Sequence, residues 1–93
     1  MHDQALRNRI VTKLLRDRVV GEHKWSVDKT VSRSLPTHER GRGKTLIEEM
    51  VADPDVPVEA YGGGHRENIR LTSVEAAVDY LEDNDGDVPF GFG

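Results

Sequence analysis

Residues 56–71 alternate apolar and polar side chains on both sides of three consecutive glycines. Val58 and Ala60 lead up to the glycines, and Ile69 and Leu71 follow them with the same period of two. This period places apolar side chains on one face of a strand, and glycine readily adopts the positive φ of a tight turn. The segment therefore predicts a β-hairpin in a sheet of two or three strands, whose apolar face other elements must cover.

A long amphipathic helix is predicted for residues 3 to about 19. Asp3 is placed to cap its start, and Gly21 is placed to stop it. The apolar stripe, at spacings of three and four, consists of Leu6, Ile10, Val11, Leu14 and Leu15. The opposite face carries Arg7, Arg9, Lys13 and Arg16. Such a face either contacts phosphates or is simply solvated, and we favour the solvated face.

A short strand and a second helix are predicted next. Residues 23–27 hold the single tryptophan, Trp25, and their apolar side chains alternate with polar ones as in a strand. Residues 26–35 fit one helical face that Ser26 can cap and Pro36 must end. Because β-branched residues are frequent here, a strand remains the alternative for this segment.

The next eight residues, 36–43, read PTHERGRG and contain two glycines and no apolar side chain except the proline. Such a segment cannot pack a core, so we predict a mobile basic loop. Residues 44–53 show helical periodicity again, and Pro54 closes them. This pattern predicts a third helix shortly before the hairpin.

A last helix is predicted after the hairpin. Thr72 and Glu75 have the spacing of a capping box, and the apolar stripe that follows predicts a helix ending near Glu82. Residues 83–93 are acidic and rich in glycine, which predicts a largely disordered tail. We therefore expect a single domain over residues 1–82, followed by this tail.

Charge is divided sharply along the chain. Residues 1–46 carry eleven Lys and Arg against five Asp and Glu, whereas residues 47–93 carry two against twelve. These halves, at +6 and −10, are hidden within a net charge of −4. The split suggests that the first half meets a polyanion and that the second half keeps the protein soluble.

Composition favours an intracellular protein. The absence of Cys excludes disulfides and thiolate metal sites and fits a reducing compartment. No apolar run approaches the roughly 20 residues that span a bilayer, and the polar His2 and Asp3 do not fit a signal peptide, so we expect a cytoplasmic location and no membrane partner. Arg outnumbers Lys nine to four, and acids outnumber bases. This bias resembles that of proteins from salt-loving archaea.

The order helix, strand, helix, basic turn, helix, hairpin, helix resembles the winged helix-turn-helix family of DNA-binding domains. The resemblance covers about residues 3–82 and includes the wing-like sequence VPVEAYGGGHRENIRLTS after the third helix. It implies an α+β fold of three helices with a C-terminal β-hairpin wing, followed by a fourth helix. In this family the third helix enters the major groove, and the wing touches an adjacent groove or the DNA backbone.

The resemblance places the recognition helix at residues 44–53, at the end of a basic segment. Its expected DNA contacts are Arg40, Arg42, Lys44 and Thr45. The expected contacts from the wing are His65, Arg66 and Arg70. A rival placement takes residues 28–35, DKTVSRSL, as the recognition helix, and it would put into the groove Lys29, Ser32 and Arg33.

The resemblance implies a transcriptional regulator that binds double-stranded DNA, and we expect a homodimer without a cofactor or a small-molecule ligand. We expect the last helix to be exposed and to be a natural pairing element, with Val74, Val78 and Leu81 as its pairing residues. The first helix could pair instead. The alternative function is a winged-helix protein–protein interaction module without DNA binding, which is favoured by Glu48, Glu49, Asp53, Asp55 and Glu59.

Other motifs are discounted. The sequence GRGKT at 41–45 ends like a Walker A phosphate loop, but no apolar strand precedes it. The sequence DNDGD at 83–87 lacks the terminal ligands of a calcium loop, and the four histidines lie in separate segments without zinc-site spacing. We therefore expect no metal site, no catalytic residues and no enzymatic activity.

Overall fold

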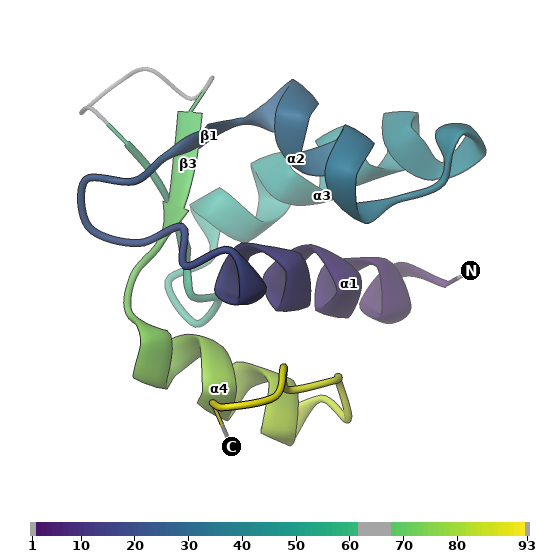
Figure 1. Cartoon of the computed structure of the whole chain (residues 1–93). Coiled ribbons are helices and arrows are strands. Elements are labelled where there is room, and N and C mark those ends of the chain that lie inside the picture. The colour runs from purple at the N-terminus through teal and green to yellow at the C-terminus, as the bar shows by residue number, and fades with distance from the viewer. Residues whose placement is uncertain (1, 62–67, 93) are drawn as a thin grey trace.

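Four α-helices and a three-stranded antiparallel sheet make up the part of the chain that the structure describes, residues 2–61 and 68–92 (Figure 1). The structure is a computed structural model. It confirms the predicted α+β class and the predicted order of helices and strands. One hydrophobic core joins the helices to the sheet.

The first helix, α1 (Asp3–Arg16), packs against each of the other three helices (Figure 1). Its predicted apolar stripe is fully buried. The helix ends before residue 19, and Arg18 in the turn that follows has a positive φ of 51°. The predicted cap is wrong, because the N-cap residue is His2 and Asp3 lies inside the first turn. A carboxylate there still interacts favourably with the helix dipole.

The strand β1 (Trp25–Ser26) leads directly into the helix α2 (Val27–Ser34). Ser26 Oγ accepts a hydrogen bond from the backbone N–H of Lys29 at 3.0 Å, so the predicted serine cap is confirmed. Both the short strand and the helix were predicted at this place. The strand alternative for the rest of the segment is wrong.

The predicted loop at residues 36–43 is instead mostly helical. A 3₁₀ turn, η1 (Thr37–Glu39), leads into the helix α3 (Arg40–Ala52), which begins four residues before the predicted start. Gly43 is buried against Val31 and Leu35 of the preceding segment. The loop prediction failed because a glycine without a side chain can lie at a tight contact between helices.

The hairpin strands are β2 (Val58–Ala60) and β3 (Asn68–Leu71). β3 lies in the centre of the sheet, in the order β1-β3-β2, and Ile69 is paired with both Trp25 and Ala60. These three side chains share the face of the sheet on which Ile69 and Trp25 are buried in the core. The predicted turn between the strands lies outside the described residues.

The last helix, α4 (Val74–Asp83), is capped by Ser73, whose Oγ accepts from the N–H of Ala76 at 3.0 Å. Thr72 is therefore not the capping residue that the sequence predicted. Ala77 and Leu81 are fully buried in the core. As a result, α4 is joined to the domain through its apolar stripe and lies along α1 (Figure 1).

The segment after α4, for which the sequence predicts a disordered tail, follows the surface of α1. Asn8 Nδ2 donates to the carbonyl oxygen of Asn84 at 2.9 Å, and Thr12 Oγ1 donates to that of Asp87 at 2.7 Å. Further along, the guanidinium of Arg18 lies 4.6 Å from the centre of the Phe92 ring. These contacts hold the segment beside the helix through side chains of α1 and the turn after it.

The contact at Gly43 gives a stability prediction. In Gly43→Ala, the new Cβ overlaps Leu35 Cδ1 and lies 3.1 Å from Val31 Cγ1. Overpacking of this kind costs about 1–3 kcal/mol, and the better helix propensity of Ala returns up to about 1 kcal/mol. We expect the free energy of unfolding, measured with urea, to fall by about 1–2 kcal/mol.

Gly41→Ala is the matched control, because no heavy atom lies within 4 Å of its new Cβ. This variant should keep or slightly raise the unfolding free energy. Equal effects of the two substitutions would contradict the tight contact at Gly43.

Candidate nucleic-acid interface

The cations predicted at the start of α3 are largely engaged within the chain. Arg40 donates through Nε to the carbonyl oxygen of Leu35 and through Nη2 to that of Ser32, both at 3.3 Å. A cation at these carbonyls suits the C-terminal end of α2, where the helix dipole is negative. Arg40 therefore has a structural role at the α2–α3 turn.

Arg42 and Lys44 both have acidic partners. Arg42 forms a two-pronged ion pair with Asp3, with Nε 3.0 Å from Oδ1 and Nη2 bonded to Oδ2. Lys44 Nζ lies 2.6 Å from Asp28 Oδ1. Thr45 is exposed on the same helix. The structure thus brings the predicted α3 residues together, but with two of their three positive charges neutralised locally.

The Asp3–Arg42 pair also shifts protonation. The hydrogen bond from Arg42 lowers the pKa of the Asp3 carboxyl below its ordinary value of 3.8, and the same bond raises the pKa of Arg42. The two side chains join the start of α1 to the start of α3.

The α2 cations of the rival placement have a different environment. Lys29 Nζ lies 5.0 Å from the centre of the Trp25 ring, and the Arg33 guanidinium lies 5.9 Å from it. Trp25 is only 4% exposed, so its ring is part of the core and both cations lie on its outer side. Among the described residues, neither cation has a carboxylate partner. Their positive charges therefore remain available to an anion.

Arg33 also belongs to a groove with three cations of α1. We call this feature, with a volume of about 450 Å³, the basic groove; its cations are Arg9, Lys13, Arg16 and Arg33. Arg9 Nε donates to the carbonyl oxygen of Ser34 at 3.3 Å, and Lys13 pairs with Asp17 at 3.1 Å. Arg16 has no such partner among the described residues. Two carboxylates, of Asp85 and Asp87, lie at the same groove.

From the sequence, the α1 cations are predicted to form a solvated face. The sequence analysis does not predict that they lie beside Arg33 of α2. Their positions, 9, 13 and 16, are spaced by four and three, so the sequence predicts that one side of α1 is basic. Periodicity within one helix does not indicate which other helix packs beside that basic side. Only the packing of α1 on α2 brings Arg33 to them.

Arg70, predicted as a wing contact, lies on the outer face of the sheet. It donates through Nη1 to the carbonyl oxygen of Gly21 at 2.6 Å and pairs with Glu59 at 3.6 Å. Arg70 and Lys24 also lie over the ring of Tyr61, at 5.0 and 4.7 Å. The other predicted wing residues, His65 and Arg66, lie outside the described residues.

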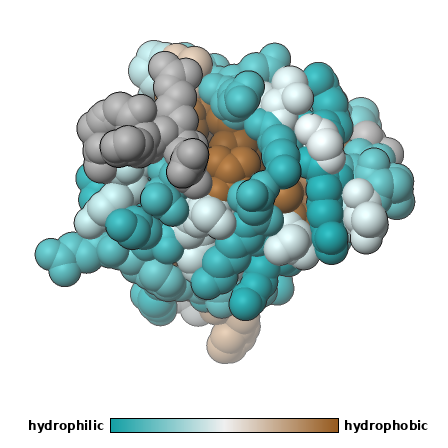
Figure 2. All heavy atoms as spheres, turned by 90° about the horizontal axis from the view of Figure 1, so that it is seen from above, coloured by the Kyte–Doolittle hydropathy of each residue, from teal (hydrophilic) through white to brown (hydrophobic). Residues whose placement is uncertain are grey.

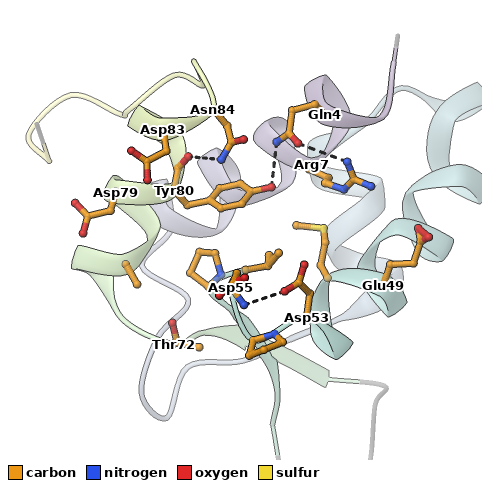
Figure 3. Close-up of a pocket in the computed structure, with 15 residues that line it drawn as sticks. Gln4, Arg7, Glu49, Asp53, Asp55, Thr72, Asp79, Tyr80, Asp83 and Asn84 are labelled. Carbon is orange, nitrogen blue, oxygen red and sulfur yellow. Dashed lines mark hydrogen bonds between the residues drawn. The ribbon is translucent and has the colours of Figure 1, made fainter.

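A second pocket, of about 630 Å³, has the opposite charge and lies between α1, α4 and the end of α3 (Figure 3). Its floor includes Tyr80, whose hydroxyl oxygen accepts from Gln4 Nε2 at 3.0 Å. We call this feature the acidic pocket. Arg7 contributes a cation to it, and the carboxylates that line it are Glu49, Asp53, Asp55, Asp79 and Asp83. This surface repels phosphate.

An apolar hollow of about 470 Å³ lies between the start of α2 and α3. Val27, Ile47 and Val51 line it, and the Lys44–Asp28 ion pair lies at its edge. An apolar patch with hydrophilic side chains beside it is visible on the face drawn in Figure 2. Such a hollow suits an apolar side chain of a partner.

The predicted pairing face of α4 needs correction. Leu81 is fully buried inside its own chain, so it cannot also contact a second copy. Val74 and Val78 are half-buried and pack against the same core. The apolar stripe thus joins α4 to its own domain, and pairing through Val74 and Val78 stays a prediction.

Within residues 2–61 and 68–92, no group of His, Asp and Glu side chains is arranged to hold a metal ion. No helix of this described part combines the length and the apolar character needed to cross a membrane. No protein-family model matches the chain, and neither the curated proteins nor the solved structures include a match.

The Asp3–Arg42 pair gives a prediction for pH. A carboxyl with a lowered pKa in the folded state stabilises the fold at pH values above its unfolded pKa, and this stabilisation is lost as pH falls through the folded pKa. We therefore expect Asp3→Asn to be less stable than the wild type at pH 6, with a difference that shrinks below about pH 3.8.

Arg42→Gln is the control for this measurement, because it keeps the Asp3 carboxylate at the start of α1. Urea unfolding of both single variants and the double variant at pH 6 and pH 3 isolates the pair. Additive effects at pH 6 would contradict a stabilising ion pair.

Proposed function

We propose that this protein binds nucleic acid through phosphate contacts in the basic groove and at Lys29. The observation that carries the proposal is the meeting of four cations from two helices in one groove. Arg is well suited to phosphate, because its planar guanidinium can donate two hydrogen bonds to one phosphate group. The residues that line the groove carry a net charge of +2, from four cations and two carboxylates, and one of these cations, Lys13, is also paired with Asp17 outside the lining.

We propose double-stranded DNA as the nucleic acid, bound by a winged helix-turn-helix fold in a transcriptional regulator. The element order supports this proposal, since α2 and α3 precede a hairpin. The pairing of β1 with β3 also supports it, because it joins the segment before α2 to the hairpin. The α2–α3 pair is then the helix-turn-helix unit.

Within this unit the charges favour α2 over α3 as the phosphate-contacting helix. Lys29 and Arg33 have no carboxylate partner among the described residues, whereas Arg42 and Lys44 do. The exposed Glu48 also follows Lys44 on α3. An approach of DNA along α3 would bring phosphates near this acid, while an approach along α2 would meet Trp25-supported cations.

A protein-interaction module remains the second candidate, and the apolar hollow favours it. Val27, Ile47 and Val51 offer an apolar site flanked by charges, a combination found at protein-docking surfaces. Val51→Glu would place a charge in this hollow. The variant should lose captured protein partners while keeping DNA affinity, and a loss of DNA affinity alone would reject the docking site.

The DNA proposal predicts a strong effect of groove cations. We expect the double variant Arg16→Gln/Arg33→Gln to bind a duplex about tenfold or more weakly at low salt, measured by fluorescence anisotropy. Each lost phosphate contact should also reduce the slope of log K against log salt by about 0.9. The single variant Arg33→Gln shows how much of the loss of affinity comes from the cation that contacts Trp25. Thermal unfolding checks that each variant is folded.

The matched control is Arg40→Gln/Arg42→Gln, which removes the same charge from the start of α3. It should weaken binding much less than the groove variant. Equal losses would move the phosphate site to α3, and absence of binding by the wild type to any duplex at low salt would reject the proposed function.

Trp25 provides an independent readout because it is the single tryptophan of the chain. Phosphate binding at Lys29 and Arg33 should change the contact of both cations with the indole ring. We expect duplex DNA to alter the tryptophan emission of the wild type in a saturable titration. An unchanged emission during binding that anisotropy detects would place the DNA away from α2.

A further inference from the structure

We infer that the segment after α4 is a built-in acidic competitor for the basic groove and lowers its affinity for phosphate. This inference rests on the proposed function. Asp85 and Asp87 lie at the groove whose cations are Arg9, Lys13, Arg16 and Arg33. Two carboxylates among four cations halve the net charge that an incoming phosphate meets.

The segment is attached to the helix that provides three of the groove cations. Asn8 and Thr12 are one helical turn apart on α1 and donate to the carbonyl oxygens of Asn84 and Asp87, at 2.9 and 2.7 Å. Arg9 and Lys13 directly follow these two donors in the sequence. The same stretch of α1 therefore holds the acidic segment and presents cations to it.

Gly86 allows the segment to lie this close. Its N–H donates to the carbonyl oxygen of Leu81 at 2.7 Å, and a Cβ at this position would lie 2.7 Å from Leu81 Cδ2 and 3.0 Å from Asn8 Cγ. Asp85 precedes it with a positive φ of 56°. The turn thus sets the two carboxylates on either side of a residue that is packed against α1.

The competitor is displaceable. Both carboxylates are exposed, and neither forms an ion pair within 4.0 Å of a groove cation in the described structure. Their attraction to the groove is therefore screened by water and salt. A polyanion with many phosphates can exceed it, whereas a weak or short anion meets a partly neutralised groove.

The test compares Asp85→Asn/Asp87→Asn with wild type in binding a fluorescent duplex at low salt. Removal of the two charges should tighten binding about three- to tenfold. Asn tolerates the positive φ at position 85, so the turn should survive the substitution. The matched control is Asp53→Asn/Asp55→Asn, which changes net charge equally at the acidic pocket.

Thr12→Val tests the attachment without changing any charge. It removes the hydroxyl that bonds to the Asp87 carbonyl oxygen, and it should tighten binding in the same direction by a smaller factor. Thr72→Val is its control, because Thr72 is exposed and far along the chain from the groove residues of α1. Added salt should reduce the effect of the Asp85/Asp87 variant.

The outcomes separate the two ideas. If all proteins bind the duplex and the affinity rises equally in the Asp85/Asp87 and Asp53/Asp55 variants, the competitor is overturned. The nucleic-acid proposal then remains intact. Tighter binding by the Asp85/Asp87 variant alone, relative to a wild type that binds detectably, would support the competitor. Absence of binding by every variant would reject the proposed function and, with it, the competitor.

Discussion

The close contact of α2 with α3 at Gly43 decides which side of α2 carries charge. Val31 and Leu35 are four residues apart and face the glycine. Successive helical residues turn by about 100°, so Lys29 and Arg33, each two residues earlier, lie on roughly the opposite side. They lie over Trp25 there, and Arg33 joins the cations of α1. When Val31 and Leu35 pack against Gly43, the opposite side of α2, with Lys29 and Arg33, therefore faces solvent.

Ion pairs within the basic half of the chain reduce the positive charge that it presents to other molecules. The first half of the chain is basic, but Asp3 and Asp28 lie against Arg42 and Lys44 and remove much of the charge from the start of α3. Four cations gather where α1 meets α2, and of these Lys13 is paired with Asp17. Acids of the second half collect mainly around the acidic pocket and at the end of the chain. Folding therefore redistributes the charge: five acids of the second half line the acidic pocket, while Asp85 and Asp87 lie at the basic groove.

Periodicity predicted the elements well because burial acts on one face of each helix and strand. Ser26 also marked the start of α2 correctly, since its cap is formed within four residues. The helical structure within residues 36–43 could not be predicted in this way. Gly43 is suited to this helix because it packs tightly against Val31 and Leu35, and this contact between helices is not visible in the local sequence. The same limit applies to the candidate site: Arg9, Lys13 and Arg16 were visible as a basic face, but Arg33 reaches them only through packing.

The short outer strands of the sheet have a consequence for how this protein meets other chains. β1 has two residues and β2 has three, and Pro57, which has no N–H, directly precedes β2. Outer strands of this length present few unpaired backbone groups to a strand from another molecule. Growth of the sheet by added strands is therefore disfavoured, which protects the protein from edge-to-edge aggregation. The surface that this protein offers to other molecules therefore consists mainly of side chains and helix faces.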